Sequence, residues 1–175
     1  AAAPLEAGDF LNAMAGKQVF QLAKTFPVLF VLLSYWQGLL ALLFPNALFC
    51  LLFANTAGGD KALVVNREFQ SSIIKTLRSC FIGRVQGYTR DIKAYVHTWK
   101  TTLAEISVNT HIWHGAEDNW SPKFMAEYLK SAIPSCSHIE ILGGLSHYSC
   151  LYETAPKICN QLSKASQEAL FKFLI

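Results

Sequence analysis

The alternation of hydrophobic and polar residues divides this chain into a long helical part and a shorter part that contains strands. Residues 9–24 predict a helix, because Asp9 can cap it and apolar residues follow along one broad face. Pro27 can begin a helix, and Pro45 must end that helix or begin the next, since proline fits the first turn of a helix but not its interior. Asn66 is expected to cap a further helix whose apolar residues recur at helical spacing.

The pattern changes in the last third of the chain, where short runs of β-branched and aromatic residues replace the helical spacing. Residues 106–115 predict a buried strand, and His138–Leu142 predicts a second one. Between them, Ser121 and Pro122 can open a helix that Pro134 ends. Strands that alternate with helices in this way are expected to pair in parallel.

These elements predict an α/β fold in two regions. Residues 1–102 are expected to form a mostly helical region, and residues 103–175 to hold two parallel strands with their helices. A sheet of two strands is marginal by itself, so partner strands are expected from outside this chain. The first residues carry no starting methionine and no signal peptide, so we expect a segment upstream of Ala1.

Composition and charge narrow the possible classes of function. The chain of 175 residues is 52% hydrophobic and 15% charged, which fits a folded domain and argues against disorder. Its net charge of +3 comes without runs of Lys or Arg, so no nucleic-acid partner is expected. The five cysteines show no C-x-x-C spacing, which favours free thiols in a cytoplasmic location. No metal or other cofactor is expected, because His111 and His114 should point to opposite faces of a strand.

The candidate chemistry lies in two loops that follow the predicted strands. Asp118 comes after the first strand and His147 after the second. Parallel strands bring such loops together at their carboxyl ends, where an aspartate can accept a hydrogen bond from the imidazole N–H and orient the ring. We therefore expect Asp118 and a ring nitrogen of His147 to lie about 3 Å apart. Taken singly, each could instead be an ordinary loop or cap residue, and Glu117 is a weaker rival for the acid.

Two motifs resemble the acid and histidine loops of the α/β-hydrolase family, and further segments fit the same pattern. The motifs are His114-Gly115-Ala116-Glu117-Asp118-Asn119-Trp120-Ser121-Pro122 and Gly144-Leu145-Ser146-His147-Tyr148-Ser149, the latter with Ser146 where that family most often has glycine. Residues 99–106 are similar to the segment that returns from a cap domain to the core. The resemblance implies a helical cap over residues 1–102, with 1–5 leaving a core strand, and the C-terminal part of a hydrolase core over 103–175.

The resemblance implies hydrolysis of a small apolar substrate, with carboxylic esters the first choice. His147 would act as general base and then general acid, and Asp118 would orient it. No G-x-S-x-G motif occurs, so the nucleophile is expected in a missing N-terminal half of the same fold. Family members with an aspartate nucleophile act on halides or epoxides, so the nucleophile stays open. A catalytically inactive, hydrolase-like binding protein is an alternative.

The charge-free stretch over residues 27–53 allows three interpretations. It can be a cap over an apolar pocket, and the pocket residues would then be Phe30, Trp36, Leu40, Phe44 and Tyr148. It can instead be a transmembrane or interfacial helix, which would give a membrane-associated protein or a contact with a membrane surface. The third interpretation is an interface between subunits.

Overall fold

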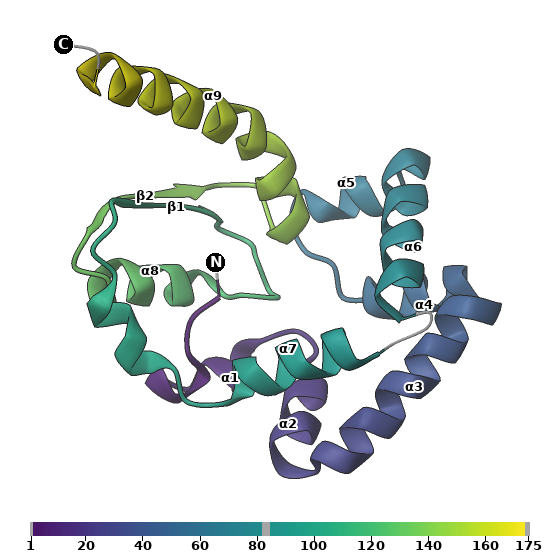
Figure 1. Cartoon of the computed structure of the whole chain (residues 1–175). Coiled ribbons are helices and arrows are strands. Elements are labelled where there is room, and N and C mark those ends of the chain that lie inside the picture. The colour runs from purple at the N-terminus through teal and green to yellow at the C-terminus, as the bar shows by residue number, and fades with distance from the viewer. Residues whose placement is uncertain (1, 82–84, 174–175) are drawn as a thin grey trace.

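The computed structural model describes residues 2–81 and 85–173 of the chain (Figure 1). Most of these residues are helical, and they include one two-stranded parallel sheet. The chain therefore belongs to a mixed α/β class, as predicted. The elements in order are η1 (Leu5–Ala7), α1 (Phe10–Ala13), α2 (Lys17–Thr25), α3 (Pro27–Leu43), α4 (Pro45–Leu52), α5 (Asp60–Val64), α6 (Arg67–Phe81), α7 (Gln86–Val96), η2 (Lys100–Glu105), β1 (Thr110–Gly115), α8 (Lys123–Ala132), β2 (Cys136–Leu142) and α9 (His147–Phe173).

The prediction of a single helix over residues 9–24 is wrong, because the helix is interrupted in its middle. The structure has two helices, α1 and α2, separated at Gly16, whose φ of 73° lies in the left-handed region that glycine adopts without strain. The break lets the Ala15 N–H donate to the carbonyl of Asn119 at 2.7 Å, in the loop that follows β1. Asp9 does not cap α1, because its carboxylate accepts the side-chain amide of Asn12 instead.

Most of the predicted helix boundaries are confirmed. Pro27 and Pro45 begin α3 and α4. Asn66 caps α6, since its side-chain oxygen accepts the N–H groups of Glu68 and Phe69 at 2.9 and 3.0 Å.

The boundaries around the sheet differ from the prediction. Ser121 does not cap α8, which begins at Lys123 after Pro122, because the Ser121 N–H is turned toward Asp118. β1 begins only at Thr110, after the short 3₁₀ helix η2, and β2 begins two residues early, at Cys136.

The two strands pair in parallel, and their ends lie side by side. Gly115 at the end of β1 is opposite Leu142 at the end of β2, so the two following loops start next to each other. α8 packs against both strands and α9 against β1, and Figure 1 shows these helices on opposite sides of the sheet. Among the described residues, no third strand pairs with either outer edge.

The main core joins the sheet region to the start of the chain. Ile112 of β1 and Met125 and Leu129 of α8 pack with Leu5 of η1 and Phe10 of α1. The helical region packs α3 against α2, α6 and α7. Its two smaller buried clusters are Ala41, Leu48, Phe81 and Val85, and Phe49, Phe53 and Phe69. Among the helices of the described residues, none combines the length and the apolar composition that crossing a bilayer requires.

Candidate active site

Asp118 and His147 form a hydrogen-bonded pair at the carboxyl ends of the two strands. Nδ1 of His147 lies 2.9 Å from Oδ2 of Asp118, as the order of the elements predicted. Asp118 sits in the turn after β1, and His147 is the first residue of α9. The carboxylate side chain is only 3% exposed, whereas the imidazole is 38% exposed. The acid is therefore enclosed, and one side of the base faces the outside.

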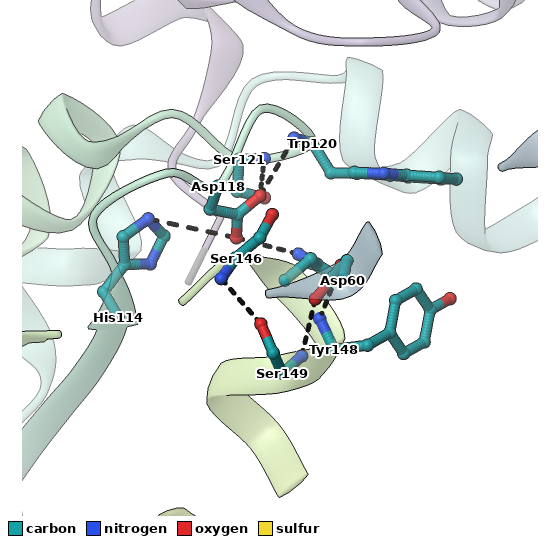
Figure 2. A network of polar contacts seen from close by, with 9 residues as sticks. Asp60, His114, Asp118, Trp120, Ser121, Ser146, Tyr148 and Ser149 are labelled. Atoms are coloured by element: carbon teal, nitrogen blue, oxygen red, sulfur yellow. Dashed lines mark hydrogen bonds and ion pairs between the residues drawn. The ribbon is translucent and has the colours of Figure 1, made fainter. Parts of the chain in front are cut away.

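Backbone donors fix the orientation of the Asp118 carboxylate. Its Oδ1 accepts the N–H groups of Trp120 and Ser121, each at 2.9 Å (Figure 2). This local turn leaves Oδ2 for His147 and suits the short side chain of an aspartate. Glu117, the rival acid, accepts the N–H of Gly144 instead, so it links the two loops and does not meet the imidazole.

The carboxylate is ionised at neutral pH. Burial by itself would raise the pKa of Asp118, but the hydrogen bond and charge of His147, together with the Ser121 N–H, lower that pKa below its ordinary value. An ionised carboxylate can only accept hydrogen bonds, so Nδ1 of His147 carries the proton of the neutral ring. Nε2 is then free to take a proton from a reacting group.

A second histidine, His114 of β1, lies beside the same carboxylate. Its Nε2 is 3.9 Å from Oδ2 of Asp118, and the residue is only 1% exposed. Burial lowers the pKa of His114, so the ring is neutral at neutral pH. From the sequence, His114 was considered only as a metal ligand and was given no place in the site, although it lies four residues before Asp118.

A buried carboxylate from the helical region holds the first turn of α9. Oδ2 of Asp60 accepts the N–H of Tyr148 at 3.0 Å, and Oδ1 accepts the N–H of Ser149 at 2.6 Å (Figure 2). Asp60 is 1% exposed and begins α5. These N–H groups have no partner within a helix, so Asp60 caps α9 at the turn that presents His147. Asp60 was not singled out from the sequence, because its partners lie 88 and 89 residues away.

Glycines allow the loops around His147 to approach one another closely. The Gly59 N–H donates to the carbonyl of Gly144 at 2.8 Å. A Cβ atom on Gly115 would come within 2.5 Å of the carbonyl oxygens of Leu145 and Ser146, so no side chain fits there. Ser146 is itself fully buried, so the histidine loop accommodates a serine in the place where the hydrolase family most often has glycine.

An aromatic wall flanks the imidazole. The Trp120 ring lies nearly parallel to the His147 ring, with centroids 6.0 Å apart, and Tyr148 lies at 5.2 Å. Phe53 contacts both Trp120 and Tyr148, and Phe69 contacts Phe53 and Tyr148. Of this wall, sequence reasoning named only Tyr148 as a pocket residue, because the contacts join four separate segments.

The other predicted pocket residues lie elsewhere. Phe30 is buried against Tyr88, and Leu40 is half-buried in the cluster around Leu48. Trp36 and Phe44 are exposed. None of the four lines the cavity beside His147.

That cavity has a volume of about 510 Å³ and lies between β1 and the first turns of α9. Its polar lining includes His114, Asp118 and His147, and its apolar lining includes Ile112 and Leu151. Cys150 also lines it, but burial raises the pKa of this thiol and keeps it protonated. Among the described side chains, no hydroxyl or thiol donates a hydrogen bond to His147, and no group of three or more His, Cys, Asp or Glu residues could hold a metal ion.

Comparisons with protein-family models, with curated proteins and with solved structures found no match to this chain. Functional inference therefore depends on the residues and their geometry.

Proposed function

We propose that this chain supplies the acid and the base of a hydrolytic site that acts on small apolar carboxylic esters. The observation that carries the proposal is the 2.9 Å contact between Oδ2 of the enclosed Asp118 and Nδ1 of the accessible His147. An acid, an oriented histidine and an outward Nε2 make up two parts of the nucleophile–base–acid arrangement used for acyl transfer.

His147 acts twice in the proposed reaction. Its Nε2 takes the proton of a nucleophilic hydroxyl as the oxygen attacks the ester carbonyl carbon, and then gives that proton to the departing alcohol. In the second half a water molecule attacks the acyl carbon and loses a proton to Nε2. Nε2 then returns that proton to the nucleophile's oxygen as its bond to the acyl carbon breaks and the carboxylic acid product leaves. Asp118 keeps the ring in the Nδ1–H form and stabilises the imidazolium in both halves.

The nucleophile comes from a polypeptide segment other than residues 1–175. The unpaired outer edge of β1 supports this assignment, because a further parallel strand can pair there and end beside the Asp118 and His147 loops. This arrangement resembles the α/β-hydrolase core, with the helical region as its cap. A serine in that segment gives an esterase, and an aspartate gives an enzyme for halides or epoxides.

An apolar substrate fits the surroundings of the pair. Trp120 and Tyr148 offer aromatic surface beside the imidazole, and the buried Phe53 and Phe69 support them from behind. Cavities of a few hundred Å³ with apolar walls and a few polar groups are typical of sites for small molecules. The cavity beside His147 has these properties.

Hydrolysis of p-nitrophenyl butyrate tests the proposal. The chain alone should not exceed background, because its base has no nucleophile to activate. Co-expression with the polypeptide encoded directly upstream should give activity that His147→Ala abolishes, a loss of several orders of magnitude. His138→Ala is the matched control, since His138 is an exposed histidine of β2.

Two results would contradict the proposal. A reconstituted activity that survives His147→Ala would show that His147 is not the general base. Activity of the chain alone that disappears when one of its own serines is changed would place the nucleophile within residues 1–175.

A further inference from the structure

The helix α3 exposes an apolar face of a kind that proteins seldom leave in water. Its inner face is buried through Phe30, Ser34, Gln37 and Ala41. Its outer face carries Val28, Leu32, Tyr35, Trp36, Leu39 and Leu43, whose exposed fractions run from 50% at Trp36 to 72% at Val28. Contiguous apolar surfaces of this kind mark sites of interaction. α3 lies at the periphery of the molecule, away from the sheet (Figure 1).

The helices that pack against α3 carry more positive than negative charge: α2 has Lys17 and Lys24, α6 has three basic residues against Glu68, and α7 has two against Asp91. Between Asp9 and Asp60 the chain has no carboxylate, and its only charged residues are Lys17 and Lys24. Both belong to α2, which packs against α3, and Lys24 is exposed three residues before α3 begins. A cationic rim beside an apolar helix complements a surface that is apolar inside and anionic at its boundary.

The length of α3 favours a helix that lies in the interface between water and a lipid bilayer over a helix that crosses the bilayer. Its 17 residues extend about 26 Å, less than the roughly 30 Å hydrocarbon core of a bilayer. Tyr35 and Trp36 sit mid-helix on the exposed face, and such amphipathic rings favour the boundary between headgroups and acyl chains.

We propose that the outer face of α3 binds the surface of an anionic lipid bilayer, with the helix lying in the plane of the interface. A second copy of the chain fits this face less well, because a symmetric contact would bring the positively charged helices α2, α6 and α7 of both copies together. The proposal is independent of the hydrolytic site, since Asp118 and His147 belong to other elements.

Flotation of the full chain with vesicles tests this proposal. Vesicles of equimolar phosphatidylcholine and phosphatidylserine should carry the chain upward, and vesicles of phosphatidylcholine alone should carry less of it. Added salt should weaken the difference. The double change Leu32→Glu and Leu39→Glu should reduce the bound fraction at least about tenfold, because it places two charges on the outer face that would enter the lipid.

Matched variants separate this surface from the rest of the chain. Leu162→Glu makes the same change at an exposed leucine of α9 and should bind as the parent does. His147→Ala should also bind as the parent does, so failure of the hydrolytic proposal would leave this one intact. The proposal would be overturned by a parent chain that does not float, or by a double variant that floats as well as the parent. It would also be overturned by a parent chain that dimerises through these leucines and leaves the vesicles unbound.

Discussion

At the scale of single residues, the carboxylate of Asp118 lies between two histidines in different environments. His147 is accessible and hydrogen-bonded to it, whereas His114 is buried beside it. The accessible ring can exchange protons with a reacting group, and the buried ring stays neutral. The two histidines therefore affect the pH dependence of the protein in different ways.

We predict that stability falls with acid because of His114. The pKa of this ring in the folded chain lies below the 6.5 of an unperturbed histidine, so below pH 6.5 the unfolded state binds more protons than the folded state. The free energy of unfolding should then decrease by up to about 1.4 kcal/mol per pH unit until the pH reaches the folded pKa. Urea denaturation between pH 7 and 5 measures this slope.

His114→Gln should flatten the slope, because glutamine does not titrate. His138→Gln is the control, since His138 is exposed. An unchanged slope in His114→Gln would refute the assignment.

The lowered pKa of Asp118 affects stability in a separate, more acidic pH range. Its stabilising contribution is present above pH 3.8 and is lost as the pH falls through its folded pKa.

At the scale of elements, the helix that presents His147 depends on a cap from a distant segment. Asp60→Ala should destabilise the chain by about 2–4 kcal/mol, because it leaves two buried N–H groups of α9 without their acceptor. Asp60→Asn should cost less, since the amide oxygen can still accept one of these bonds. Chemical denaturation measures both effects. Asp91→Ala, on the exposed side of α7, should change stability by less than about 0.5 kcal/mol; an equal loss in Asp91→Ala and Asp60→Ala would contradict the capping role.

The break between α1 and α2 makes a second prediction at this scale. Gly16 has a φ of 73° and open space around the position of a Cβ, so Gly16→Ala should cost about 1 kcal/mol through backbone strain alone. Gly87 lies within α7 and also has open space, so Gly87→Ala should stabilise by about 0.5–1 kcal/mol. Thermal denaturation of the two variants compares them. Equal shifts would show that Gly16 does not hold the left-handed conformation.

At the scale of the whole molecule, features that depend on local sequence patterns could be predicted, whereas contacts between segments far apart in the chain could not. Proline placed the starts of α3 and α4, and the strand–loop order placed Asp118 beside His147. The Asp60 cap stayed hidden, because nothing in a local pattern distinguishes an aspartate that turns the chain from one that caps a helix 88 residues later. The same holds for Glu6, whose carboxylate accepts the N–H groups of Trp99 and Lys100 and ties the start of the chain to the segment before β1.

Of the predicted pocket residues, Tyr148 lines the cavity and the four from residues 30–44 lie elsewhere, for a related reason. Apolar residues of α3 have the composition of a pocket wall, but hydrophobicity alone does not distinguish a wall from an exposed face. Trp36 lies on the outside, while Phe53 and Phe69 reach the candidate site through the packing of α4 and α6. Which apolar residues meet His147 is decided by that packing, and the packing joins segments far apart in the chain.

The tautomer of His147 tests the central claim most directly, because it reports the pairing with Asp118 without any nucleophile or substrate. Long-range ¹H–¹⁵N NMR correlation at pH 8 should show the His147 ring with its proton on Nδ1 and with Nε2 unprotonated. Asp118→Asn should shift the population toward the Nε2–H form, since the amide can donate to Nδ1. His138, which is exposed, should be unaffected. A parent chain with the Nε2–H tautomer, or a tautomer unchanged by Asp118→Asn, would contradict the assignment of Asp118 and His147 as the acid and base of a hydrolytic site.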